Sequence, residues 1–321
     1  MFPIEETLRR LAQIPNVQVQ AGAPLARHTR FAIGGPADVY AEAGSVEAFV
    51  EALGLARASG LPWFVIGGGT NLIISDEGFR GVVLRLTADA LRAEGHRITA
   101  EAGAELGAVV DFAIERGLKG VETLAGIPGS LGGAIYGSAG AYGHAISEVV
   151  ETVTLFDGAS VRSIGNAECG FRYRESLFKR RKDWVILSAG LALEAAGAAE
   201  LGRTAGEILA ERNRKFPPSL KCAGSIFKNL ILAELPPAVA AQAPERVVRE
   251  GKAPAAYFLE QAGAKSLVRG DIRVADYHAN LVYNAGAGTA RDLVSLVAEL
   301  KQRVRDRFGL ELEEEVQYVG F

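Results

Sequence analysis

The stretch WFVIGGGTN at residues 63–71 joins a short apolar run to three consecutive glycines, a threonine and an asparagine. Four apolar residues bounded by a turn signal are typical of a buried strand. Because glycine has no side chain, the loop after this strand presents backbone amides that a pyrophosphate can approach. An ordinary turn at the end of a strand is the other interpretation of the same residues. Neither a Walker A lysine nor a GxGxxG helix start is present, which disfavours kinase-like and Rossmann nucleotide sites.

Periodic segments on both sides of this loop predict a small βαββ unit. A strand is expected at 38–43, and a helix follows for which Ser45 is the predicted N-cap and Gly60 the predicted stop. Further strands are expected at 81–86, 97–102, 148–156, 184–193, 279–284 and 310–316. Further helices are expected at 105–116, 200–215, 255–262 and from Thr289 to Gly309, the last with a capping box of Thr289 and Asp292.

A second glycine-rich segment, AGIPGSLGGAIYGSAGAYG, occupies residues 125–143, with seven glycines between residues 126 and 143. So many missing side chains permit close backbone approach to a large flat ligand or to a phosphate chain. Close packing of two backbones is an equally good explanation for one such run. Two separate runs in one chain, each after a strand-like stretch, favour a dinucleotide cofactor.

The overall composition predicts a folded, cytoplasmic protein. Of 321 residues, 49% are hydrophobic, and 35 basic and 38 acidic residues give a net charge of −3. This balance offers no broad field for nucleic acid or an anionic membrane. Two distant cysteines and four scattered histidines predict neither a disulfide framework nor a metal site. The N-terminus MFPIEETLRRLAQI lacks the layout of a signal peptide, and no apolar run is long enough to span a membrane.

Motifs along almost the whole chain occur in one order. They are His28-Thr29, IGGPAD (33–38), IGGGTNLIISDEGFRGVV (66–83), GIPGSLGGAIYGSAGAYG (126–143), FRYRESLF (171–178), AGSIFKN (223–229), LEQAGAK (259–265), HANLVYN (278–284) and EVQYVG (315–320). With them the chain resembles the bacterial FAD-dependent UDP-N-acetylenolpyruvoylglucosamine reductases. The short spacing between KFP at 215–217 and Gly224-Ser225 is similar to the compact subtype. Gly137-Ser138, Leu230 and Gln317 depart from the usual pattern.

The resemblance implies an α+β fold: a two-part FAD-binding unit of the vanillyl-alcohol-oxidase type, followed by an α/β substrate domain. The corresponding division is 1–86 and 87–215 for the two FAD-binding subdomains, and 216–321 for the substrate-binding domain. FAD is the implied cofactor. Its implied contacts come from the two glycine-rich runs: Gly67, Gly68, Gly69, Thr70, Asn71, Gly126, Ile127, Pro128, Gly129, Ser130, Gly133, Ala134, Gly140 and Gly143.

The resemblance also implies the reaction. NADPH reduces the flavin, which passes the hydride to the enolpyruvyl group of UDP-N-acetylenolpyruvoylglucosamine and yields UDP-N-acetylmuramate for peptidoglycan synthesis. Ser225 corresponds to the proton donor, and Arg174 and Glu315 to the residues that stabilise the intermediate. The implied substrate-binding residues are Tyr173, Lys215 and Asn229.

Each catalytic candidate has a plainer interpretation from the residues alone. Ser225 can be part of a Gly-Ser turn, and Arg174 can be one solvated charge in a basic run. Glu315 can belong to the solvent-exposed face of a strand. A flavin oxidase of the same fold, or a non-catalytic nucleotide-binding relative, are the competing functions. No nucleic acid, membrane or obligate protein partner is inferred.

Overall fold

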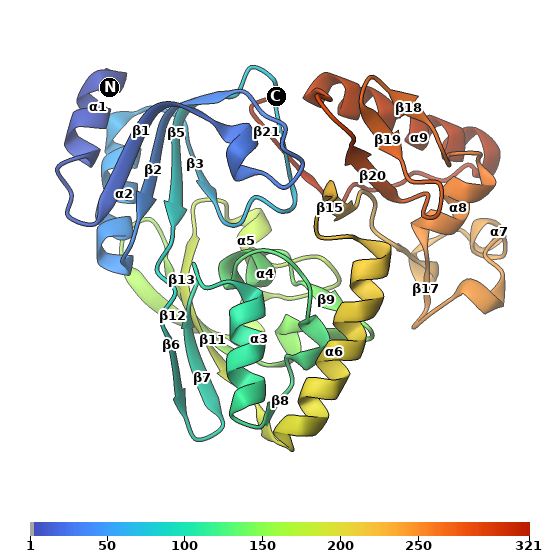
Figure 1. Cartoon of the computed structure of the whole chain (residues 1–321), viewed down its shortest axis with the longest axis horizontal. Coiled ribbons are helices and arrows are strands. Elements are labelled where there is room, and N and C mark those ends of the chain that lie inside the picture. The colour runs from blue at the N-terminus through green and yellow to red at the C-terminus, as the bar shows by residue number, and fades with distance from the viewer. Residues whose placement is uncertain (1–2) are drawn as a thin grey trace. The chain divides into compact units, whose positions relative to one another are not determined.

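The computed structural model describes residues 3–321, which form two compact units (Figure 1). The first unit contains the chain up to Ala23, residues 37–68 and residues 80–214. The second unit contains residues 24–36, 69–79 and 215–321. The predicted division at residues 86 and 215 stays a prediction, because units defined by contacts need not coincide with domains.

Two sheets build the first unit. The four-stranded sheet has the order β1 (Val17–Pro24), β2 (Pro36–Ala43), β5 (Phe79–Leu86) and β3 (Trp63–Ile66), with β3 and β5 parallel. The five-stranded sheet is antiparallel, in the order β12 (Val161–Gly165), β11 (Val150–Phe156), β13 (Val185–Ala192), β7 (Arg97–Glu101) and β6 (Leu91–Glu94). One continuous apolar core serves both sheets. The N-terminal βαββ prediction is confirmed, whereas β6 and β12 were not predicted.

The helix Val46–Ser59 of the first unit begins and ends where the sequence predicts. Ser45 Oγ accepts a hydrogen bond from the Ala48 N–H at 3.2 Å, and Gly60 ends the helix with φ 75°. The helices are α1 (Ile4–Leu11), α2 (Val46–Ser59), α3 (Leu106–Glu115), α4 (Leu131–Tyr136), α5 (Leu177–Arg180) and α6 (Ala198–Lys215). The short pairs are β8 (Leu118–Lys119) with β14 (Glu194–Ala195), and β9 (Gly140–Ala141) with β10 (His144–Ala145).

The second unit has its own sheet and its own core. Its antiparallel sheet has the order β15 (Lys221–Ser225), β20 (Leu281–Asn284), β19 (Ile272–Val274) and β18 (Val268–Arg269). The second unit also contains two separate two-stranded sheets: β4 (Leu72–Ile74) with β21 (Gln317–Val319), and β16 (Leu230–Ile231) with β17 (Lys252–Ala253). Its helices are α7 (Pro237–Ala240), α8 (Ala255–Gln261) and α9 (Ala290–Phe308). No helix within residues 3–321 is long and apolar enough to cross a membrane.

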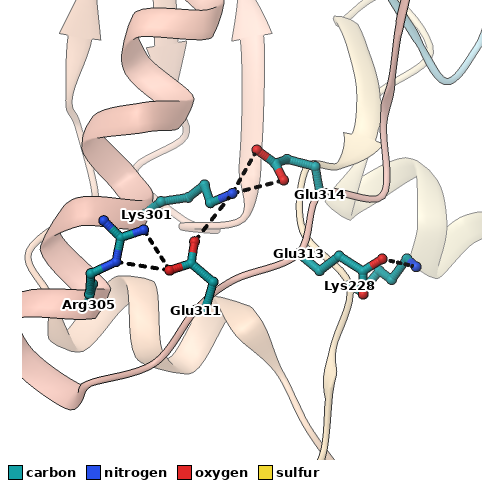
Figure 2. A network of polar contacts seen from close by, with 6 residues as sticks. All are labelled: Lys228, Lys301, Arg305, Glu311, Glu313 and Glu314. Carbon is teal, nitrogen blue, oxygen red and sulfur yellow. Dashed lines mark hydrogen bonds and ion pairs between the residues drawn. The ribbon is translucent and has the colours of Figure 1, made fainter.

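The predicted terminal strand at 310–316 is displaced. The strand observed is Gln317–Val319, while Glu314 makes a single bridge to Phe227. The acidic residues before it form ion pairs instead of a sheet face, as Figure 2 shows: Glu311 pairs with Arg305, Glu313 with Lys228, and Glu314 with Lys301. The alternating charged and apolar residues of 310–316 therefore belong to a segment packed along α9, and not to a strand with one solvent-exposed face.

The N-terminus of α9 is held by residues from two distant parts of the chain. Thr289 Oγ1 accepts from the Asp292 N–H at 3.1 Å, so the predicted capping box is confirmed. The Asp76 carboxylate accepts from the Ala290 and Arg291 N–H groups at 2.8 and 3.0 Å. Three backbone donors of the first helical turn are thus satisfied, and the segment 69–79 is tied to the C-terminal region.

Replacing Asp76 with alanine is expected to lower the free energy of unfolding by about 1–2 kcal/mol, because two helical N–H groups lose their acceptor and the helix dipole loses a counter-charge. Chemical denaturation followed by circular dichroism measures this change. Glu77→Ala is the control, because Glu77 is an exposed neighbouring carboxylate. Equal destabilisation by both substitutions would contradict the role given to Asp76.

Candidate active site

The two glycine-rich runs meet in the first unit. A Cβ atom on Gly68 would lie 2.9 Å from the Cα of Gly129, and one on Gly67 would lie 2.7 Å from Ser130 Oγ. Gly129 itself has φ 115°, a conformation that side chains rarely adopt. Close packing of two backbones therefore accounts for glycine at positions 68 and 129.

Gly133 of the second run is not required by packing within the protein. It is exposed, and a Cβ atom there would meet only Ser130 Oγ, at 3.5 Å. Gly126 and Gly143 are also exposed, but their φ values of 73° and 84° themselves favour glycine. Backbone that stays uncovered beside a tight glycine contact fits the approach of a flat ring or a pyrophosphate. The residues present therefore fit FAD. Between them, Ala134 is buried, while Ile127 is half-buried and Pro128 exposed at the surface of the run.

The last part of the first glycine run lies in the second unit. Gly69 has φ 61°, and a Cβ atom there would lie 1.8 Å from the His28 carbonyl oxygen. Thr70 is half-buried. Asn71 Nδ2 donates to the Glu315 carbonyl at 2.9 Å, and the Asn71 carbonyl accepts from the Gln317 N–H at 3.0 Å. Asn71 thus connects this run to the C-terminal segment.

Arg174 is attached to the second glycine run. It is half-buried, and its Nη2 donates to the Gly140 carbonyl at 3.0 Å, with its guanidinium 5.3 Å from the centre of the Tyr173 ring. Its φ is 58°, and nearby Ser138 and Tyr142 also have positive φ, at 46° and 54°. Such backbone strain in non-glycine residues is concentrated at functional sites. Arg174 is therefore more than a solvated member of a basic run.

Ser225 and Glu315 are brought together through one backbone segment of the second unit. Ser225 ends β15 just after Gly224, whose φ is 75°, and the pairing with β20 shifts register there. The Glu315 N–H donates to the carbonyl of Ile226, the residue after Ser225, at 2.7 Å. Arg174 belongs to the first unit, and Ser225 and Glu315 belong to the second.

Neighbouring acids in the C-terminal segment have structural partners. Both oxygens of Glu314 accept from Lys301 Nζ, at 3.1 and 3.2 Å, and Glu313 accepts from Lys228 Nζ at 2.5 Å (Figure 2). The side chain of Lys228 is only 11% exposed. Each of these two carboxylates is thus engaged by a lysine that fixes the course of the segment.

The two predicted substrate-binding residues of the second unit, Lys215 and Asn229, have different neighbours. The Lys215 ammonium lies 5.2 Å from the centre of the Phe216 ring, and the Lys215 carbonyl accepts from the Tyr277 hydroxyl at 3.2 Å. His278 packs edge-on against Phe216, and burial together with the charges of Lys215 and Lys265 lowers the pKa of this imidazole to about 4. His278 is therefore neutral at pH 7. Asn229 Oδ1 accepts from the Ala255 N–H at 3.4 Å.

One residue near Ser225 has no counterpart among the predicted site residues. Asn280 is 2% exposed, and its side chain makes two hydrogen bonds with the backbone of Phe227. The signal in the sequence that could have identified Asn280 is an amide side chain within the predicted strand at 279–284, because a polar group that becomes buried needs specific hydrogen-bond partners.

Comparisons with known proteins identify the cofactor and the family. Residues 37–160, which include both glycine runs, match the family described as "FAD binding domain". The chain is thus an FAD-binding protein. Residues 216–319 match "UDP-N-acetylenolpyruvoylglucosamine reductase, C-terminal domain".

Full-length relatives give the same result. The chain is 62% identical to the UDP-N-acetylenolpyruvoylglucosamine reductase of Solibacter usitatus, over 97% of this chain and 100% of that protein. It is 33% identical to the enzyme of that name from Bacillus subtilis, over 99% of both. The crystal structure of the Thermus caldophilus reductase is 29% identical, with a TM-score of 0.73, covering 94% of this chain and 98% of that one. The chain belongs to the UDP-N-acetylenolpyruvoylglucosamine reductase family, and it is an FAD-dependent oxidoreductase.

The contact between the glycine runs predicts how FAD binding responds to one methyl group. Gly68→Ala is expected to weaken FAD binding at least about tenfold, because the new Cβ would push the two runs apart and misplace their amides. Flavin absorbance after gel filtration, and titration of the apoprotein with FAD, measure the effect. Gly54→Ala in α2 is the control, since a Cβ atom there meets nothing within 4 Å. Full flavin retention by the Gly68 variant would show that the contact does not shape the cofactor site.

Proposed function

We propose that this protein reduces the enolpyruvyl group of UDP-N-acetylenolpyruvoylglucosamine to give UDP-N-acetylmuramate, with NADPH as the hydride donor, in the cytoplasm. We further propose that Ser225 is the proton donor and that Arg174 and Glu315 stabilise the intermediate. The observation that carries the proposal is the attachment of Glu315 to the backbone of Ile226, next to Ser225. An acid and a hydroxyl on two neighbouring segments joined by a backbone hydrogen bond are suited to delivering a proton.

The bound flavin supplies the hydride chemistry. Addition of hydride to the β-carbon of the substrate leaves negative charge shared between the α-carbon and the adjacent carboxylate. A guanidinium can hold such a carboxylate through two parallel hydrogen bonds, which is the role proposed for Arg174. Because Nη2 of Arg174 already donates to the Gly140 carbonyl, its guanidinium is held beside the second glycine run.

The proton at the α-carbon would come from Ser225 Oγ. A serine hydroxyl is a weak acid in water, so this step requires a fixed geometry and a neighbouring group that stabilises or relays charge. Glu315 is the proposed neighbour. Glu314, the adjacent carboxylate, is held by Lys301 and is therefore unsuited to this role.

Substrate binding would involve Tyr173, Lys215 and Asn229. A lysine suits the diphosphate of a UDP-sugar, and Lys215 is supported by its position beside the neutral His278 and the ring of Phe216. Tyr173 adjoins Arg174 in the first unit and offers an aromatic surface to substrate or to NADPH.

The proton-donor role predicts an asymmetric loss of activity. Ser225→Ala is expected to slow reoxidation of the reduced flavin by the enolpyruvyl substrate about 10²–10⁴-fold, while NADPH still reduces the flavin at nearly the normal rate. Anaerobic stopped-flow absorbance separates the two half-reactions. Equal loss in both would make Ser225 a structural residue. Rapid reoxidation of the wild-type protein by air, with no substrate required, would indicate a flavin oxidase instead.

The choice between adjacent carboxylates gives a second expectation. Glu315→Gln should lower the substrate half-reaction by about 10²-fold or more, because the amide cannot relay a proton. Glu314→Gln, the control, should weaken only the ion pair with Lys301 and leave both half-reactions within about twofold of wild type. If the two substitutions exchange these effects, the catalytic carboxylate is Glu314.

A further inference from the structure

Asn280 forms a clamp on the segment that follows Ser225. Its Oδ1 accepts from the Phe227 N–H and its Nδ2 donates to the Phe227 carbonyl, both at 2.9 Å. Its own carbonyl accepts from the Ile226 N–H at 3.0 Å. Asn280 and Phe227 are 2% and 1% exposed, so no water can replace these bonds without rearrangement.

At Phe227 the Asn280 side chain takes over the hydrogen bonding that the main chain of β20 provides to β15 up to that point. Strand β15 pairs regularly with β20 at Lys221 and Cys222, and the register then shifts before Ser225 pairs with Leu281. On the β20 side the chain turns, since the Leu281 N–H donates to the His278 carbonyl at 2.9 Å. The Asn280 amide reproduces the donor and acceptor of a strand residue at this point, and so fixes the main chain of Phe227 just after β15 ends.

The opposite edge of the same segment carries Glu315. The Glu315 N–H donates to the Ile226 carbonyl at 2.7 Å, and the Lys228 N–H donates to the Glu313 carbonyl at 2.9 Å. The ion pairs Lys228–Glu313 and Lys301–Glu314 tether this edge further (Figure 2). Residues 226–228 are thus held between the Asn280 side chain on one edge and residues 313–315 on the other.

We propose that Asn280 is a positioning residue for the reaction: its amide clamp on Phe227 sets Ser225 relative to Glu315. The inference rests on the proposed roles of Ser225 and Glu315. Without the clamp, the buried N–H and C=O of Phe227 lose their partners, and the segment shifts to recover hydrogen bonds. A displacement of about 1 Å between reacting groups can cost about 10²-fold in rate. Asn280 does not itself take part in proton transfer.

Strand β20, which begins at the residue after Asn280, supplies a matched control. Asn284 is 4% exposed, its Nδ2 donates to the Phe31 carbonyl at 3.1 Å, and its Oδ1 accepts from two N–H groups, those of Gly286 and Gly288. Replacement by aspartate keeps the acceptor and removes the donor at either position. Both substitutions place a carboxyl group in a buried site beside a carbonyl oxygen. The side chain of Asn280 bonds to Phe227, two residues after Ser225, whereas the hydrogen bonds of the Asn284 side chain go to residues outside β15.

The experiment compares Asn280→Asp, Asn284→Asp and Ser225→Ala in the flavin-loaded protein, by anaerobic stopped-flow. Asn280→Asp is expected to slow reoxidation at saturating UDP-N-acetylenolpyruvoylglucosamine by about tenfold to 100-fold. Reduction by NADPH and the apparent affinity for the substrate should stay within about threefold. Asn280→Asp and Asn284→Asp should lower the thermal unfolding midpoint by comparable amounts. Asn284→Asp should leave the rates of both half-reactions within about threefold of the wild-type rates. If Asn280→Asp does not fold, Asn280→Ser, which introduces no charge, takes its place.

The possible results distinguish a failure of the inference on Asn280 from a failure of the proposed role of Ser225. Parallel losses in the two asparagine variants, or loss of both half-reactions in the Asn280 variant, would make the clamp purely structural and overturn the inference. Normal reoxidation of the Asn280 variant, when Ser225→Ala is slow, would also overturn it while the proposed function stands. Normal reoxidation of Ser225→Ala would instead remove the proposed proton donor.

Discussion

The second unit depends on one set of backbone hydrogen bonds, those between residues 226–228 and residues 313–315. This pairing joins segments that lie far apart in the chain, with the Glu315 N–H to Ile226 carbonyl bond of 2.7 Å at its end. Buried backbone groups must be paired, so a short stretch of main chain with partners on both edges has little freedom. The hydroxyl of Ser225 and the carboxylate of Glu315 inherit that rigidity from the backbone.

Two N-terminal segments help to build the same unit. Asp76 caps α9, Asn71 donates to the Glu315 carbonyl, and the Phe31 carbonyl accepts from the Asn284 amide. All three bonds use a side chain to satisfy the main chain of a distant element. The glycine run at 67–71 therefore serves two purposes. Gly67 and Gly68 contact the second run in the first unit, while Asn71 supports the segment that carries Glu315.

The first unit shows a related arrangement around Gly140. Three non-glycine residues with positive φ (Ser138, Tyr142 and Arg174) gather there, and the guanidinium of Arg174 is bonded to the Gly140 carbonyl. Strained conformations of this kind cost about 1–3 kcal/mol each and persist only where the surroundings enforce them. Ser138 is also one of the positions at which the chain departs from its family's usual residues.

Local signals in the sequence determined many of the longer elements and the family of this protein. Ser45 and Gly60 bound α2, Thr289 and Asp292 begin α9, and the apolar run before Gly67 forms β3, because caps, glycine stops and periodicity act over a few residues. The ordered motifs led to FAD and to the reductase family, both of which the comparisons support. They selected Ser225, Arg174 and Glu315 without any information on their contacts. The tertiary structure alone decided that Glu313 forms an ion pair with Lys228, that Gly68 packs against Gly129, and that Asn280 clamps Phe227. Those contacts join residues widely separated in sequence, and no local preference encodes them, since each depends on where the folded chain brings its partner.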